Sequence, residues 1–253
     1  MSTARILTLA AVLAGYGSAA TAQTPAATGE PAAMPGMPPP VHDQEIFAHG
    51  MFSQLEGRTS GTNTEFRWEG QGWAGTDYDK LWIKSEGTLQ GNGTLDDGQH
   101  QFLYSRAITT YFDLQGGLRS DIDSRPTRNW AALGVQGLAP YFFDLELTGY
   151  ASGQGHLAAK LEASYDLLLT QRLILQPQIE VNLYSKADPA RMVGAGFSDI
   201  DTGLRLRYEI DRKFAPYLGV VYEGKFGQTA SLARRAGEST GDVRFAFGLR
   251  LWF

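Results

Sequence analysis

The sequence predicts an all-β fold, a transmembrane antiparallel up-and-down β-barrel of about twelve strands, with ten as the fallback. Three observations support this prediction. From Ile46 onward, segments of about ten residues alternate apolar and polar side chains, as strands tilted across a bilayer do. The polar face of these segments carries charges of both signs. The last segment, residues 243–253, has a large apolar residue at every odd position and ends in an aromatic residue, which is typical of the closing strand of an outer-membrane barrel.

Residues 1–22 have the features of a secretory signal peptide. Arg5 precedes a short apolar core over residues 6–14, and Ala20-Thr21-Ala22 offers a small-residue cleavage site before Gln23. The chain contains no cysteine, which excludes a lipoprotein anchor at this site and structural disulfides. No later run approaches the roughly 20 apolar residues that a spanning helix needs. Export therefore leaves the periplasm, the medium or the outer membrane as the destination.

Residues 23–45 differ in composition from the rest of the chain. Closely spaced prolines, which culminate in residues 38–40, oppose both a helix and a sheet ladder. The segment is therefore expected to be a disordered or polyproline-like tail that contains Met34 and Met37. We expect three parts: the signal peptide over 1–22, the flexible tail over 23–45 and the barrel over 46–253.

The expected strands follow one another with turn residues between them. They lie near residues 46–58, 64–74, 80–90, 99–108, 112–122, 129–138, 142–152, 156–169, 172–185, 199–210, 215–226 and 242–253. Links after odd-numbered strands look long and polar, notably over 91–98, 186–198 and 227–241, whereas links after even-numbered strands are tight. Short periplasmic turns and long outer loops are the asymmetry expected of these barrels, and an even strand number returns the carboxy terminus to the periplasmic side.

The two faces of each expected strand indicate what the barrel touches. In 172–184, for example, Leu175 and Ile179 alternate with Gln176, Gln178 and Glu180. A face this charged cannot pack the core of a soluble sandwich, because each unpaired buried ion costs several kcal/mol. Inside a narrow barrel such side chains must meet as a paired, hydrated network. The expected lumen network comprises Lys84, Glu86, Lys160, Glu162, Asp166, Glu180, Arg205 and Arg207.

Charge and motifs exclude several function classes. The formal net charge of −5 argues against a nucleic-acid partner and allows cations. A lipid hydrolase would need a Ser–His pair on the lipid-facing surface, but neither His100 nor His156 has a serine at an obvious neighbouring motif. The chain also lacks a Gly-x-Ser-x-Gly elbow, a His-Glu-x-x-His zinc signature and a phosphate-binding glycine loop. We therefore expect no enzyme and name no catalytic residue.

Motifs rich in aromatic residues and glycine recur in order along the expected barrel. They include Trp68-Glu69-Gly70-Gln71-Gly72-Trp73 and residues 81–87, 103–108, 130–141, 165–177, 203–210 and 214–220. In these motifs, collinear over residues 42–253, the chain resembles the copper resistance protein B family. The resemblance implies an outer-membrane barrel that works in copper tolerance, with a periplasmic amino-terminal tail whose Met and His residues bind copper. By family association only, it also implies a periplasmic multicopper oxidase as a partner.

The candidate copper ligands follow from this resemblance and from ligand chemistry. Met34 and Met37 stand three residues apart in the tail and His42 follows, while His49 and Met51 share one strand face at the barrel entrance. Thioether sulfur is a soft ligand that favours Cu(I). The tail departs from the family pattern, which is longer and richer in methionine. The alternatives are a linker with two incidental methionines and a first strand on which the last two residues merely pack against lipid.

Two functions remain open at this point. The first is an outer-membrane protein that binds copper ions and sequesters or exports them from the periplasm, with outer-membrane lipid and copper as its partners. The alternative is a passive small-solute channel without metal preference. A lumen filled with paired charges favours low conductance and therefore favours the copper-binding function over the passive channel.

Overall fold

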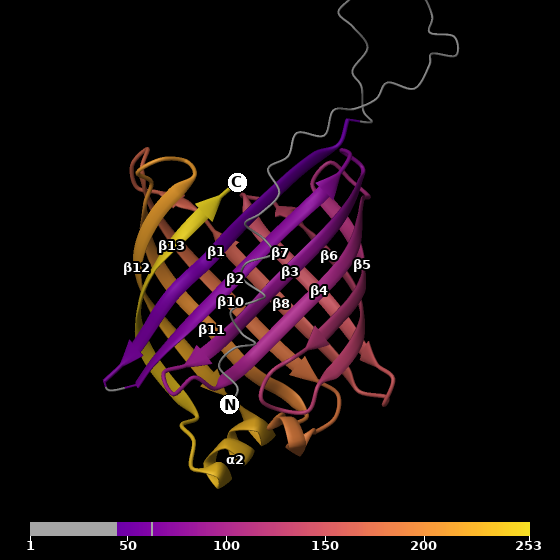
Figure 1. Cartoon of the computed structure of the whole chain (residues 1–253), viewed down its shortest axis with the longest axis vertical. Coiled ribbons are helices and arrows are strands. Elements are labelled where there is room, and N and C mark those ends of the chain that lie inside the picture. Colours follow the sequence, from indigo (N-terminus) through magenta and orange to yellow (C-terminus); the bar gives the residue numbers. More distant parts are fainter. Residues whose placement is uncertain (1–44, 62) are drawn as a thin grey trace, which may run out of the picture. The chain divides into compact units, whose positions relative to one another are not determined.

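The computed structural model describes residues 45–61 and 63–253. The expected signal peptide and nearly all of the expected tail, with Met34, Met37 and His42, lie outside these described residues. The described residues form one closed antiparallel barrel, in which each strand pairs with the strands next to it in sequence and β1 pairs with β13 to close the ring (Figure 1). The predicted fold class is confirmed, with twelve strands around the ring.

The strands are close to the expected segments. Their bounds are β1 (Phe47–Ser60), β2 (Asn63–Gly75), β3 (Asp79–Gln90), β4 (Leu95–Ala107), β5 (Phe112–Asp121), β6 (Arg128–Ala139), β7 (Phe143–Ser152), β8 (Leu157–Tyr165), β9 (Leu167–Leu168), β10 (Leu173–Tyr184), β11 (Gly196–Tyr208), β12 (Phe214–Lys225) and β13 (Gly241–Trp252). β8 and β9 together occupy one place in the ring, because both pair with β10 and only Asp166 separates them.

Two boundaries differ from the sequence prediction. β4 begins at Leu95 rather than near residue 99, because Asp97 pairs with Thr88 and Leu95 with Leu89 across a bulge. The link before it therefore spans only residues 91–94 and is not the long loop that its glycines and aspartates suggested. The expected strand over 156–169 is interrupted at Asp166, whose carboxylate accepts a hydrogen bond from Arg207 at 2.7 Å.

Side chains alternate between an apolar outer face and a polar lumen. Leu118, Leu218 and Phe245 are 65%, 68% and 68% exposed on the outer face, whereas Gln101 and Arg119 are 4% and 3% exposed inside. This is the reverse of a protein surrounded by water, and it is the arrangement of a barrel whose outer wall contacts lipid. Within the described ranges, none of the helices has the length and apolar character needed to cross a bilayer.

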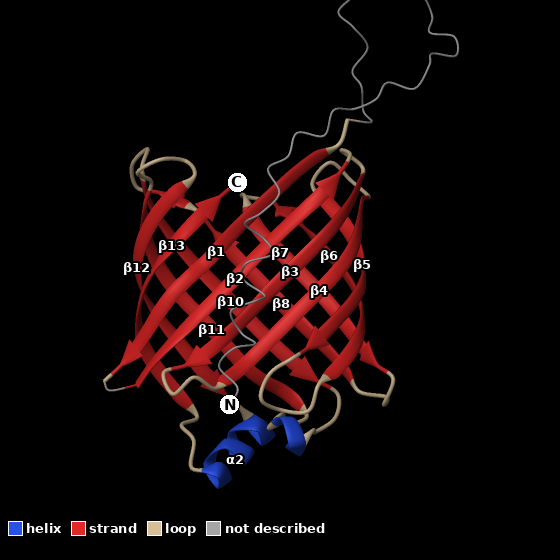
Figure 2. Cartoon of the chain, viewed as in Figure 1, coloured by secondary structure: helices blue, strands red, loops and turns tan. Residues whose placement is uncertain are grey.

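The two ends of the barrel differ. The terminal end is where β1 begins and β13 finishes, and the loop end carries both helices (Figure 2). The helices are η1 (Pro189–Arg191), in the link over 185–195, and α2 (Gly227–Ala236), in the link over 226–240. The expected asymmetry between long and short links is carried by these two links. The other loop-end links are nearly as short as the turns at the terminal end.

α2 is held at the loop end of the barrel, beside the start of β11, by small residues (Figure 2). Ala230 and Ala233 are 5% and 1% exposed, and Thr229 Oγ1 lies 2.9 Å from Ser198 Oγ of β11 while accepting a hydrogen bond from Gly194 N at 2.8 Å. The helix ends at Gly237, whose φ of 76° is the left-handed conformation that glycine adopts at no steric cost.

A bulge in β1 sets which of its residues enter the lumen. The pairing of β1 with β2 shifts between Phe52 and Gln54, so that Ser53 is the extra residue. An extra residue reverses the alternation, because side chains in a strand have a period of two. The lumen therefore receives His49 and Met51 before the bulge and Gln54, Glu56, Arg58 after it.

Candidate functional site

The terminal end of the lumen is lined by aromatic rings around His49. The imidazole lies 5.0 Å from the ring of Trp252 in an edge-on arrangement and 6.1 Å from the ring of Trp73. Trp73 lies 6.2 Å from Trp82, so four rings follow one another across β13, β1, β2 and β3. These cross-strand neighbours share the lumen face. His49 therefore faces the interior rather than lipid.

Met51 joins His49 on this face, directly opposite Trp252 of β13. Its sulfur accepts a hydrogen bond from Arg250 Nη2 at 3.4 Å, which fixes the thioether toward the lumen. One imidazole and one thioether are thus held two residues apart at the opening of the barrel. We call His49, Met51, Trp73 and Trp252 the mouth site.

Deeper in the lumen, one lysine gathers three carboxylates. Lys160 Nζ lies 2.6 Å from Glu86, 2.5 Å from Glu162 and 3.5 Å from Glu180. Arg67 supports the group through Glu180 at 3.2 Å. These five residues are the central cluster. Their three carboxylates bring oxygen atoms within 4.8 Å of one another, a spacing that suits a metal ion, but the ammonium group of Lys160 already bridges them.

A second cluster lies beside the closure of the ring. Glu56, which is 0% exposed, receives hydrogen bonds from Arg58 Nε at 2.7 Å, Arg205 Nη2 at 2.9 Å and the Tyr217 hydroxyl at 2.9 Å. Arg58 also reaches Asp201 at 2.7 Å and Glu223 at 2.5 Å. We call this group the seam cluster, and it comprises Glu56, Arg58, Asp201, Arg205, Tyr217 and Glu223.

The opposite wall of the lumen combines an apolar patch with charged side chains. Leu103, Trp130, Ala132 and Tyr150 form a buried apolar patch against which Trp82, Ala158 and Tyr184 pack. On the terminal-end side of the patch, Lys84 donates to Glu146 at 2.6 Å and to two glutamine side chains, those of Gln115 and Gln136. Ion pairs and side-chain packing thus cross the lumen from wall to wall at mid-height.

A cavity of about 660 Å³ opens at the loop end. Arg67, Gln99 and Glu180 line its inner part, which is therefore the loop-end side of the central cluster. His156 and Met192 also line it. The barrel thus has a polar vestibule at the loop end and an aromatic mouth at the terminal end, with the charged clusters between them.

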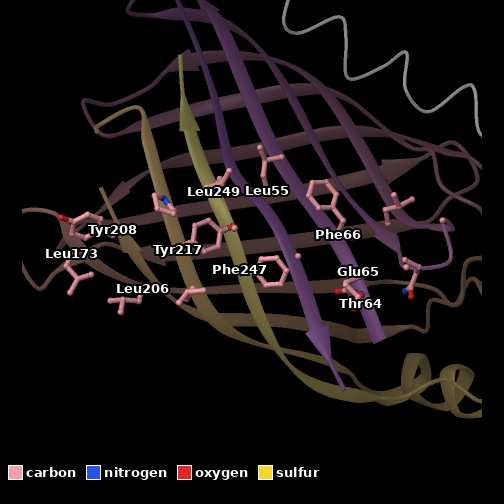
Figure 3. A pocket seen from close by; sticks show the side chains of 18 residues that line it. Leu55, Thr64, Glu65, Phe66, Leu173, Leu206, Tyr208, Tyr217, Phe247 and Leu249 are labelled. Atoms are coloured by element: carbon pink, nitrogen blue, oxygen red, sulfur yellow. The ribbon is translucent and has the colours of Figure 1, made fainter. Parts of the chain in front are cut away.

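A larger hollow, of about 1040 Å³, lies along β1, β13 and their neighbours (Figure 3). Its apolar lining includes Leu55, Phe66, Phe247 and Leu249, which share the face of the exposed outer side chains. An apolar groove on this face is part of the surface that contacts lipid.

The structure places all eight predicted lumen residues on inward-facing positions and pairs each of them. Lys160 joins Glu86, Glu162 and Glu180, Arg207 pairs with Asp166, and Arg205 and Lys84 find the partners given above. Sequence reasoning missed Glu56, Arg58 and Arg67. The alternation of Gln54, Glu56 and Arg58 was a usable signal, but the bulge at Ser53 broke the pattern of the first strand and hid it.

The structure adds a contact of His100 that the sequence did not predict. Ser85, fifteen residues earlier, lies opposite it on β3 with Oγ 3.1 Å from His100 Nδ1. This Ser–His contact arises from strand register and has no sequence motif. Within residues 45–61 and 63–253, no hydrogen bond orients the other ring nitrogen, so a third catalytic group is missing from the described contacts.

Comparison with known proteins relates the whole barrel to one family. The model of the family described as Copper resistance protein B precursor (CopB) matches residues 46–253. Copper resistance protein B of Escherichia coli is 44% identical over 213 residues, which cover 84% of this chain and 72% of that protein. The Copper resistance protein B homolog of Pseudomonas syringae pv. tomato is 42% identical over the same shares of both chains.

The solved structure of one porin supports the fold. The NanC porin has a TM-score of 0.50 at 10% identity and covers 81% of this chain and 99% of the porin. The KdgM porin has a TM-score of 0.47 at 12% identity over the same shares. Porins are outer-membrane barrels, and the outward apolar face described above fits that location. On the match of its barrel to the family model and to both relatives, the chain belongs to the copper resistance protein B family.

Proposed function

We propose that this protein is a non-enzymatic outer-membrane barrel that binds copper ions at its terminal-end mouth and sequesters them or exports them from the periplasm. The observation that carries the proposal is the position of His49 and Met51, which lie two residues apart on the lumen wall where β1 enters the barrel. A barrel wall that only separates lipid from the lumen does not require this donor pair. Imidazole and thioether together favour copper, and the thioether favours Cu(I).

The orientation of the barrel supports a periplasmic source of copper. In outer-membrane barrels the short turns and both chain ends face the periplasm, and the long loops face outward. On this rule the mouth site opens to the periplasm and α2 lies outside. The tail residues Met34, Met37 and His42 would precede the mouth directly and deliver copper to it. A periplasmic multicopper oxidase remains an expectation from the family.

The rings around the mouth suit a cation as well. The electron-rich faces of tryptophan attract positive charge within about 6 Å of the ring centroid. Lys80 Nζ already lies 5.7 Å from the Trp73 centroid and Lys84 Nζ 5.6 Å from that of Trp82. A copper ion held by His49 and Met51 would enter the same aromatic surroundings beside Trp252.

The central and seam clusters argue against free diffusion of small solutes. Most members of both clusters are less than a tenth exposed. The central cluster joins β8 to β3 across the lumen, and the seam cluster joins β1 to β11 and β12. Passage of copper would require these ion pairs to rearrange. Sequestration at the mouth requires no rearrangement, which makes the mouth the first place to test.

The first prediction is that replacing His49 with Gln and Met51 with Leu together lowers Cu(I) affinity at least tenfold in the full-length protein purified in detergent. Removal of both donors leaves only weaker oxygen and amide ligands at the mouth itself. Affinity is measured by competition with a coloured Cu(I) chelator. A second variant replaces Met34, Met37 and His42, so that the tail and the mouth are separated in one experiment.

The matched control removes the same two ligand types at the other end of the barrel, through His156→Gln with Met192→Leu. We expect its Cu(I) affinity to equal that of the wild type. If Cu(I) affinity falls only in the tail variant, the copper site lies in the tail and not at the mouth. Wild-type affinity in every variant, with ready ion flow in planar bilayers, would replace the copper proposal with the passive channel.

A further inference from the structure

A hydrogen-bonded row of three polar side chains crosses the lipid-facing side of β2, β3 and β4. Trp68 Nε1 donates to Ser85 Oγ at 3.2 Å, and Ser85 Oγ lies 3.1 Å from His100 Nδ1. We call Trp68, Ser85 and His100 the outer row. Their neighbours on the same strand faces, Phe66, Ile83 and Phe102, are 45%, 48% and 61% exposed, so the row is surrounded by side chains that contact lipid.

The row continues toward the loop end of the barrel. His100 lies directly opposite Ser120 of β5, which lies opposite Asn129 of β6. Ser120 Oγ donates to Asn129 Oδ1 at 2.8 Å. Asn129 is the second residue of β6 and therefore stands at the loop-end rim. A polar stripe thus extends from the loop-end rim into an otherwise apolar outer wall.

The hydrogen bonds fix where the protons of the row reside. Trp68 Nε1 is only a donor, so Ser85 Oγ accepts its hydrogen. Among the described side-chain hydrogen bonds Ser85 Oγ meets no acceptor other than His100 Nδ1, so it directs its own hydrogen there. Nδ1 of His100 is then the acceptor, and the neutral ring carries its proton on Nε2. Among the described hydrogen bonds, the His100 ring makes one through Nδ1 and none through Nε2. A donor left without a partner in hydrocarbon costs several kcal/mol.

Packing around Trp68 indicates that this arrangement is built rather than incidental. Gly87 lies opposite Trp68, and a Cβ at Gly87 would overlap the indole ring. The absence of a side chain there lets the indole lie against β3 with its nitrogen toward Ser85. Polar residues at membrane depth are costly and mark functional positions.

We propose that the outer row binds the ester carbonyl oxygen of an acyl lipid in the outer leaflet, through His100 Nε2. A carbonyl oxygen is an acceptor without a proton, as this donor requires, and ester-linked lipids supply it on the apolar side of their head groups. The polar stripe from Asn129 to Trp68 offers the path along which the ester reaches the imidazole. The Ser85–His100 contact serves to hold the tautomer, since no group orients the ring for proton transfer.

The test compares two lipids that differ only in this acceptor. The full-length protein is reconstituted in dioleoyl phosphatidylcholine and in its dialkyl ether analogue, and the thermal unfolding midpoint is measured in both. We expect the midpoint of the wild type to be several degrees higher in the ester lipid. The difference should vanish in His100→Leu and should remain in Phe102→Leu, a lipid-facing control two residues away on the same strand face.

A second variant keeps the test decisive if His100→Leu does not fold. Ser85→Ala keeps the imidazole but removes the group that fixes its tautomer, so the ester preference should shrink. An equal midpoint in both lipids for the wild type, or an undiminished ester preference in His100→Leu, would overturn the proposal. Copper affinity is independent of the outer row, so the copper proposal and this one fail separately.

Discussion

The central and seam clusters each contain two cations and three carboxylates, but they are arranged around central groups of opposite charge. In the central cluster one ammonium group, that of Lys160, stands among three carboxylates. In the seam cluster one carboxylate, that of Glu56, is held by two guanidinium groups and a tyrosine hydroxyl. Removal of the Lys160 charge therefore leaves three carboxylates close together. Removal of the Glu56 charge leaves two arginines that keep other partners.

The comparison shows that the effect of removing a lumen charge on stability depends on which other ion pairs and hydrogen bonds its partners keep. Arg58 keeps Asp201 and Glu223 when Glu56 is lost, and Arg205 keeps the side-chain oxygens of Gln54 and Gln178. Glu162 has no second cation partner among the described ion pairs. Its charge depends on Lys160 alone.

The largest effect is expected from Lys160→Met. Lys160 is the only ammonium group among these carboxylates, of which Glu86 and Glu180 are buried and Glu162 is partly exposed. Its loss should lower the free energy of unfolding by about 3–5 kcal/mol, the cost of breaking a buried ion pair by removing one partner. Urea unfolding in lipid vesicles measures this change. A divalent cation such as Mg²⁺ should restore part of the stability, because the oxygen atoms already stand at metal-binding spacing. Wild-type stability in this variant would show that the carboxylates are not held by Lys160.

A smaller effect is expected from Glu56→Gln. The amide keeps the size of the side chain and one oxygen acceptor for Arg205 and Tyr217, so the free energy of unfolding should fall by about 1–3 kcal/mol. The same urea titration gives the value. A loss equal to or larger than that of Lys160→Met would reverse the contrast between the two clusters.

The smallest effect is expected at the rim, from Lys225→Met. Its pair with Glu238 has an Nζ to Oε2 distance of 2.8 Å, but the two side chains are 38% and 43% exposed. Exposed pairs contribute about 0–1 kcal/mol and are screened by salt. The variant therefore serves as the baseline, and its unfolding curve should approach that of the wild type as the salt concentration rises.

Much of the fold was predictable because strand alternation is local. The parity of residues 172–184 assigns Glu180 to the lumen without knowledge of any partner strand, and the final aromatic residue identifies the closing strand. The helix α2 had a usable signal as well: Ala, Leu and Arg are strong helix formers, and Gly237 follows them at the position where glycine ends helices. It was missed because long outer loops are expected to be irregular.

Features that depend on register were not predictable. Ser85 and His100 meet only because β3 and β4 pair with one particular offset, which no local pattern encodes. The bulge at Ser53 decides that His49 and Met51 face the lumen, and serine gives no sign of it. Asp166 breaks its strand in a segment whose alternation continues on both sides.

Closure of the ring has a consequence for the order in which the mouth site can form. All other strand pairs join segments that follow one another along the chain, whereas the contact between Arg250 and Met51 spans 199 residues. Contacts between such distant positions form late, since the entropy of closing the loop must be overcome first. A chain with every hairpin in place but an open seam would therefore lack the ring of Trp252 beside His49. Tryptophan fluorescence at the mouth would report completion of the barrel.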